Sequence, residues 1–534
     1  MNVTTVTKRC TAVLAASVFA MALGAAPGAQ AAGPKKGGTL VAVWQLEPHT
    51  LYSARGGGSS PLIVNTKILE KLVRQVAIDK FEPELASSWD ISSDYKTYTF
   101  KLRKTNWHDG KPFTSADVQF TLKDVLAKLS SNGLLRAIEK VETPDAQTAI
   151  VHFSRPAPEY LALASLAASQ SSIIPKHIYA GTKYSKNPAN NAPIGTGPFK
   201  LKEWARGSHV EMVRNEGYWQ KGRPHLDRLV IRYIRDPGAR AAAMEGGEVL
   251  LAVSNPFPGP EIDRLAARPD LVADKKGYDT SKWQMLMEMN VRNPILAKKQ
   301  VRQAIAYAID QNFIVDTIFY GLGNASTGPI PVSQTRFYSP DTASYPYDPK
   351  KAGELLDKAG YPVKADGKRF TLKLVASPWF TENKKTGQYL KQVLEDIKIG
   401  INMETPDRGG TIRQIYCNYD FDITVSNSIA SADPLIGTTH WFTSNGIRKC
   451  AAFRNASDYS NPALDKVVDQ AAVETDPAKR KALLAEFQKI AMENVPIMHL
   501  VDIGMTNVVN TKVHNYSFTS QWMYDSWKDV WLEK

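Results

Sequence analysis

The sequence predicts an α/β protein, because strand-like and helix-like segments alternate along the chain. Residues 98–102 alternate apolar and polar side chains, which is typical of a half-buried strand. The apolar residues of 301–309 instead recur at helical spacing. With 534 residues, 43% of them apolar, the chain is long enough for two to four domains and too apolar to be disordered.

The same two patterns locate the other elements in chain order. We expect strands at 39–44, 98–102, 145–153, 370–375 and 421–425, and helices at 114–129, 301–309, 348–359, 390–397 and 477–491. The helix at 348 has clear ends, since Asp348-Pro349 opens it and Gly360 follows it. No internal repeat is evident.

Residues 1–31 resemble a secretory signal peptide. A basic pair at 8–9 precedes an uncharged apolar run at 12–26, and the small residues of Ala29-Gln30-Ala31 suit cleavage. The alternative is a membrane anchor, but the run is shorter than the ~20 residues that span a bilayer. Cys10 precedes the run, so it is not a lipidated cysteine at the cleavage site. We therefore expect a periplasmic protein that is secreted through a cleaved signal peptide and is not lipidated.

The cysteines and charges fit an exported protein. Only Cys417 and Cys450 remain after cleavage, and they either pair in an oxidising compartment or stay as two thiols. The formal charge of +13 includes two residues of the leader, and the other basic residues are scattered without a long run. This distribution argues against a nucleic-acid partner. It favours an anionic solute or an anionic membrane surface.

No motif of catalysis is visible. The chain has no Gly-x-Ser-x-Gly elbow, no His-Glu-x-x-His helix and no phosphate-binding glycine loop followed by Lys-Ser/Thr. The nine histidines include no pair at i,i+4 spacing, so no local metal site is indicated. The carboxylates Asp420 and Asp422 share one side of a strand, where solvated carboxylates are the commoner outcome. An exported hydrolase is the alternative from another class, and we expect neither an enzyme nor a cofactor.

Several motifs occur together that resemble the family 5 extracellular solute-binding proteins, which serve ABC importers of peptides, opines and nickel chelates. The longest is 86–118, which contains Trp107-His108-Asp109-Gly110-Lys111-Pro112-Phe113. The others are Gly195-Thr196-Gly197-Pro198-Phe199, Asn215-Glu216-Gly217-Tyr218-Trp219, the run Val301–Asp310, Ala359-Gly360-Tyr361 and Asn494-Val495-Pro496. The resemblance covers residues 36–534.

The resemblance implies a periplasmic-binding-protein-like class II fold, with two lobes joined by a two-segment hinge and an extra subdomain on the first lobe. Carried over, lobe I takes 32–76, 192–287 and 505–534, the extra subdomain 77–191, and lobe II 288–504. The hinge segments would lie near Met287–Asn290 and Leu500–Met505. Such lobes close on a solute, and the closed form meets the ABC permease and its ATPase complex. We expect a monomer.

Cleft residues are expected at the ends of strands and in the loops that follow them. These candidates are Trp44, Gln45, Tyr52, Trp379, Arg408, Ser426, Asn427, Ser428, Ala430 and Trp441. The aromatic candidates have an alternative interpretation as packing of the walls.

Two of these positions bear on the solute. Arg408 matches a position that contacts ligand in related peptide binders, where its guanidinium would suit a carboxylate or phosphate. The alternative is a surface arginine paired with Asp407 or Glu404. Ala430 stands where peptide binders of the family carry an aspartate for the peptide's amino group. We therefore predict the substrate-binding component of an ABC transporter for an opine, an organic acid conjugate or a peptide-like solute, with an oligopeptide- or dipeptide-binding protein as the alternative.

Overall fold

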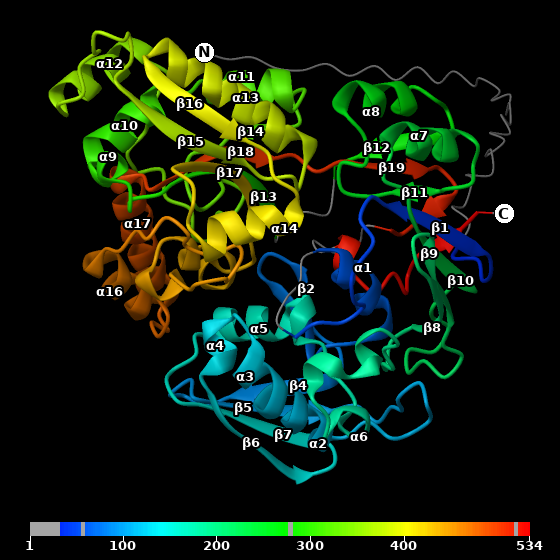
Figure 1. Cartoon of the computed structure of the whole chain (residues 1–534). Helices are drawn as coiled ribbons and strands as arrows, with labels where there is room; N and C mark the ends of the chain where they lie inside the picture. Colours follow the sequence, from blue (N-terminus) through cyan, green and yellow to red (C-terminus); the bar gives the residue numbers. More distant parts are fainter. Residues whose placement is uncertain (1–32, 55–58, 276–280, 517–521, 534) are drawn as a thin grey trace, which may run out of the picture.

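The computed structural model describes residues 33–54, 59–275, 281–516 and 522–533 (Figure 1). The expected signal peptide 1–31 lies outside these residues. The fold is α/β, as predicted, and it contains two large sheets and one smaller four-stranded sheet. Within the described residues no helix is both long and apolar enough to cross a membrane.

The first large sheet has the strand order β12-β19-β11-β1-β10-β9-β8. Its strands are β1 (Thr39–Trp44), β8 (Phe199–Ala205), β9 (His209–Arg214), β10 (Arg228–Tyr233), β11 (Leu251–Ala252), β12 (Leu271–Asp274) and β19 (Asn507–Asn510). Its helices are α1 (Ser59–Ile68), α7 (Pro237–Glu245) and α8 (Gly259–Ala266), and a short pair, β20 (Val513–His514) and β21 (Trp531–Leu532), lies near the C-terminus. Strand β1 pairs in parallel with β10 and β11, so segments far apart in sequence meet at its end.

The smaller sheet, β4-β5-β7-β6, forms a separate layer drawn in blue and cyan in Figure 1. Its elements are β4 (Ala86–Ile91), β5 (Thr97–Leu102), β6 (Ile138–Asp145), β7 (Thr148–Phe153), α2 (Ser115–Gln119), α3 (Ala127–Leu129), α4 (Gly133–Arg136), α5 (Glu159–Ala167) and α6 (Lys176–Tyr179), next to the hairpin β2 (Val73–Ala77) and β3 (Lys80–Pro83). The strand expected at 145–153 is observed as β7, but it begins at Thr148, and Asp145 instead ends β6. Asp145 accepts a hydrogen bond from the amide of Gln147, so a turn separates β6 from β7.

The second large sheet has the order β14-β18-β13-β17-β15-β16. Its strands are β13 (Lys282–Met289), β14 (Gly323–Ala325), β15 (Phe370–Ala376), β16 (Ile399–Glu404), β17 (Ile423–Ala430) and β18 (Ile497–Ile503). Its helices are α9 (Pro294–Ala297), α10 (Lys299–Tyr307), α11 (Gln311–Phe313), α12 (Pro349–Lys358), α13 (Thr381–Asp396), α14 (Arg408–Thr411), α15 (Pro434–Gly437), α16 (Pro462–Ala471) and α17 (Pro477–Asn494). Buried methionines of β13 pack with α10 and α13 in one core.

The sheets place one predicted boundary differently. Residues 282–287 were assigned to the first lobe, but all of β13 pairs with β17 and β18 of the second sheet. Most of its side chains are buried, as is usual for a strand in the interior of a sheet. The chain returns to the first sheet at Gly504–Thr506, between β18 and β19, which overlaps the expected second hinge segment. The division into lobes otherwise remains a prediction.

His108 links the 107–113 turn to the Gly195–Phe199 motif. Its Nδ1 accepts a hydrogen bond from the amide of Gly195 at 3.3 Å, and its Nε2 donates to the carbonyl of Gly197 at 3.0 Å. This geometry requires a neutral imidazole. Burial lowers the pKa of His108 to about 4, and the charge of Lys200 acts in the same direction.

We expect this histidine to make the fold acid-sensitive. Between pH 6.5 and about 4 the unfolded chain binds a proton at position 108 that the folded chain does not bind. The free energy of unfolding therefore decreases as the pH is lowered through that window. His108→Gln should reduce the slope of the unfolding free energy against pH, by an amount that corresponds to at most one proton bound on unfolding. Urea denaturation at several pH values between 4.5 and 7 measures that slope. An unchanged slope would show that His108 is not held neutral.

Candidate functional site

Trp379 and Arg408 meet at the carboxyl end of the second sheet. Trp379 follows β15, and Arg408 opens the short helix α14 after β16. The centre of the Arg408 guanidinium lies 5.4 Å from the centroid of the Trp379 ring, so the two predicted residues form a cation–π contact. The parallel order of β15 and β16 brings these loops together.

The alternative pairing of Arg408 is absent from the described residues. Asp407 caps α14 by accepting from the amide of Gly410, and Glu404 accepts from the side chain of Gln414. Burial lowers the pKa of the Arg408 guanidinium, and the charge of Arg235 lowers it further. Arg235 follows β10 of the first sheet, so cations carried by both large sheets act on one region.

Four of the predicted residues have a buried polar atom with no hydrogen-bond partner among the described residues. These atoms are Trp379 Nε1, Ser426 Oγ, Asn427 Nδ2 and Ser428 Oγ. Asn427 uses only its other end, since its Oδ1 accepts from Asn383 Nδ2 at 2.8 Å. A buried polar atom left unpaired costs about 1–3 kcal/mol, so these atoms suit a bound solute.

Phe453 belongs to the same cluster, although no feature of the sequence singles it out. Its ring centroid lies 5.5 Å from that of Trp379 and 6.0 Å from that of Tyr416, yet the residue is 40% exposed. The closest signal in the sequence is its neighbour Cys450. Of the two alternatives for Cys417 and Cys450, the structure has the disulfide.

The remaining predicted residues do not join this cluster by any contact among the described residues. Trp44 and Tyr52 lie in the core of the first sheet, where Trp44 Nε1 donates to Ser60 and the Tyr52 hydroxyl donates to the carbonyl of Ser172. Gln45 is half-buried at the end of β1. Trp441 is buried in a third core. The burial of the three aromatic residues, Trp44, Tyr52 and Trp441, agrees with packing of the walls.

Ala430 ends β17 as a buried residue opposite Lys282 of β13. Asp502 of β18 is in register with Gln284, two residues from Lys282 along β13, and accepts a hydrogen bond from the Gln284 side chain. Asp433, the later acidic position, is bound to Arg480 through both carboxylate oxygens.

The layer of β4–β7 and the hairpin β2–β3 make several contacts with the part of the chain that carries the second large sheet. Arg336 pairs with Asp79 at 2.6 Å, Phe337 packs edge-on against Tyr160, and Arg454 donates to the carbonyl of Ser131. The Arg336 guanidinium also lies over the Tyr160 ring. A cavity of about 290 Å³ lies beside these residues. The two parts are thus in direct contact in this structure.

Glu203, His209 and Glu211 on β8 and β9 form a group that could approach one cation. Glu211 already pairs with Lys202 and Arg228, and His209 pairs with Glu203. These ion pairs satisfy the carboxylates without a metal.

Comparison with known proteins identifies the family. Residues 80–449 match the model of the bacterial extracellular solute-binding proteins, family 5. The chain belongs to this family. It is therefore a non-catalytic substrate-binding protein of an ABC importer, as predicted.

Relatives of this family 5 protein differ in the solute that their names state. A Brucella ovis protein named an ABC transporter peptide-binding protein is 29% identical over 527 residues, covering 95% of this chain and 94% of the relative. The glutathione-binding protein GsiB of Pectobacterium atrosepticum is 29% identical, covering 81% and 82%. The structure of AgaA from A. tumefaciens R10 with agropinic acid is 30% identical, covers 93% and 99%, and superposes with a TM-score of 0.78.

Proposed function

We propose that this binding protein captures a small acidic solute, such as an opine or an organic acid conjugate, and that Arg408 anchors the acid. The observation that carries the proposal is a guanidinium that is partly buried over Trp379 and has no carboxylate partner among the described residues. Arg235 adds positive potential from the first sheet. An arginine in this setting offers two parallel donors to a carboxylate.

The unpaired polar atoms of the other candidate residues support an oxygen-rich solute. Trp379 Nε1 and Asn427 Nδ2 are donors, and Ser428 Oγ can donate or accept. Such a set would pair with carboxylate, carbonyl or hydroxyl oxygens. The names of two relatives agree in one respect, since agropinic acid and glutathione both carry carboxylates, although glutathione is a peptide that also carries an ammonium group.

A free peptide is the second candidate, and the name of the Brucella relative favours it. Ala430 argues against it. A peptide's ammonium group needs an acceptor, and at the position of the aspartate of peptide binders β17 carries the methyl group of Ala430, opposite Lys282. We therefore place the amine-bearing peptide second.

The delivery route follows from the family. We propose that the leader 1–31 is removed on export, that the mature monomer remains unlipidated in the periplasm, and that closure of lobes I and II presents the solute to the permease and its ATPase. The contacts of Arg336 and Tyr160 described above would belong to the closed arrangement.

Titration calorimetry of the mature protein with agropinic acid, glutathione and dialanine tests the proposal. We expect heat of binding with at least one of the two acids and none with dialanine. Arg408→Ala should lower the affinity for the acid about 10- to 100-fold, because hydrogen bonds to a charged group contribute about 1.5–3 kcal/mol.

Arg264→Ala is the matched control. Arg264 is an arginine on α8 that pairs with Glu245 and Glu261 outside the cluster, so its loss should leave the affinity unchanged. Binding of dialanine alone, or acid binding that Arg408→Ala does not alter, would contradict the anion anchor.

A further inference from the structure

The segment from Cys450 to Asp458 has an unusual backbone. Cys450, Phe453 and Asp458 have φ angles of +61°, +60° and +65°, in the left-handed region. Each such non-glycine residue costs of order 1–3 kcal/mol, and residues of this kind cluster at functional sites. A bulky phenylalanine is a poor choice for this conformation unless its ring is needed there.

The near end of this segment is tied to the residues below the cluster. The disulfide joins Cys450 to Cys417, and the amide of Cys450 donates to the carbonyl of Tyr416 at 2.7 Å. His440 Nε2 donates to the carbonyl of Phe453 at 3.1 Å. The backbone at Phe453 is thereby held by the disulfide three residues before it and by the hydrogen bond to its own carbonyl.

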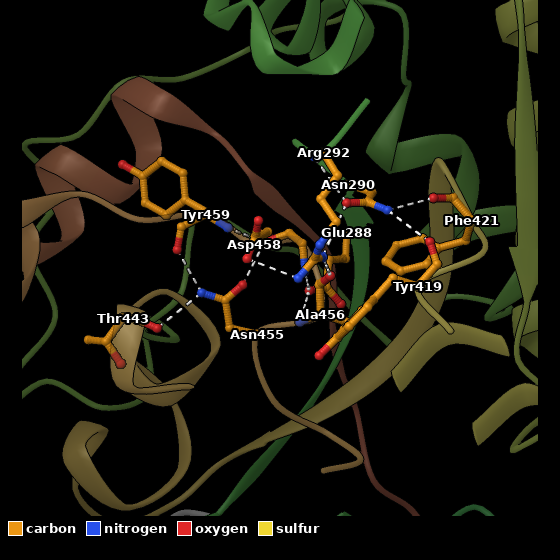
Figure 2. Close-up of polar contacts among 11 residues, drawn as sticks. Glu288, Asn290, Arg292, Tyr419, Phe421, Thr443, Asn455, Ala456, Asp458 and Tyr459 are labelled. Carbon is orange, nitrogen blue, oxygen red and sulfur yellow. Dashed lines mark hydrogen bonds and ion pairs between the residues drawn. The ribbon is translucent and has the colours of Figure 1, made fainter. Parts of the chain in front are cut away.

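The far end is held by the network in Figure 2, which surrounds Glu288 at the end of β13. Glu288 Oε1 accepts from the amides of Ala456 and Ser457 at 2.8 and 2.7 Å. Arg292 donates to the carbonyl of Ala456 and pairs with Asp458. The disulfide at one end and the buried Glu288 at the other therefore hold a segment whose central residue, Phe453, remains exposed.

The Phe453 ring is exposed on one side and contacts the site on the other. Its partners are the rings of Trp379 and Tyr416. The next residue, Arg454, donates to the carbonyl of Ser131 in the layer of β4–β7. Phe453 thus contacts the Arg408–Trp379 cluster through Trp379, while the residue after it contacts the layer of β4–β7.

We propose that Phe453 is a specificity-determining residue whose ring packs against the carbon skeleton of the acid held by Arg408, and that the Cys417–Cys450 disulfide pre-positions it. The inference rests on the proposed function and adds an apolar wall to it. A ring held in advance loses little conformational freedom on binding, so its contact contributes to affinity. The solute class becomes an acid with a ring or chain large enough to reach Phe453.

Calorimetry with agropinic acid and glutathione tests this on four variants of the mature protein. For the acid that the wild type binds, we expect Phe453→Ala to lower the affinity at least tenfold. The affinity of Phe453→Tyr should stay within threefold of the wild-type value. Phe453→Gly relieves the backbone, so it should unfold no earlier than the wild type yet bind as weakly as Phe453→Ala. The double variant Cys417→Ser/Cys450→Ser should weaken binding several-fold.

Phe313→Ala is the matched control, because Phe313 on α11 is similarly exposed and stacks on Tyr389. Its affinity should equal that of the wild type. If Arg408→Ala abolishes binding while the Phe453 variants bind normally, the inference fails and the proposed function stands. If the wild type binds neither acid, both fail. Normal binding by Phe453→Gly with weak binding by Phe453→Ala would reduce Phe453 to a backbone role and overturn the inference.

Discussion

Replacing Asp433 with alanine is expected to lower the unfolding free energy by about 3–5 kcal/mol, because it strands a buried guanidinium. Arg480 donates to both carboxylate oxygens of Asp433, at 2.7 and 3.0 Å. The two side chains are only 4% and 0% exposed. Asp433 also caps α15 by accepting from the amide of Leu435, so the variant loses a helix cap as well.

Urea denaturation of the wild type and the variant measures the difference. The double variant Asp433→Leu/Arg480→Met should recover most of the loss, since replacing both buried charges with apolar groups of similar size is often neutral. Glu248→Ala is the control. It breaks an exposed ion pair with Arg232 and should cost less than about 1 kcal/mol. Equal losses from Asp433→Ala and Glu248→Ala would mean that the buried pair is not held as the structure shows.

Gly195→Ala is expected to prevent folding or to cost at least about 3 kcal/mol, at or beyond the usual range for overpacking. A Cβ at position 195 would lie 1.7 Å from the carbonyl oxygen of Ile68 and 2.5 Å from its carbon. Both atoms are backbone at the end of α1, so no side-chain rotation relieves the clash. The amide of Gly197 donates to the same oxygen at 2.9 Å, which holds the two segments together.

Soluble yield and the midpoint of thermal unfolding report the effect. Gly133→Ala is the control, because Gly133 opens α4 with no atom within 4 Å of its added Cβ and no positive φ. That change should be neutral or should stabilise the protein by about 0.4–1 kcal/mol, because alanine reduces the conformational entropy of the unfolded chain. A Gly195→Ala variant as stable as the wild type would show that Ile68 is not in contact with the motif.

The close approach also explains why glycine stands at positions 195 and 197. Neither residue has a positive φ in the structure, so a left-handed backbone is not the reason. Their small size matters because Ile68 of α1 crosses them. A local pattern predicts conformations of the chain, whereas a contact with a distant helix is invisible to it.

The site shows the same limit. Arg408, Trp379, Asn427 and Ser428 were predictable, because each follows or ends a strand with a clear pattern. Phe453 was not, since it lies in no regular element and its place depends on a disulfide, on His440 and on Glu288 of another strand.

The sequence by itself determined the α/β class, the position of most elements, the family and the candidate anion anchor, because periodicity, caps and motifs act over a few residues. Only the tertiary structure decided that β13 lies in the second sheet, that Ile68 requires glycine at 195, and that Phe453 stands beside Trp379. These are contacts between segments far apart in the chain, and long-range packing selects among arrangements that local patterns leave equal.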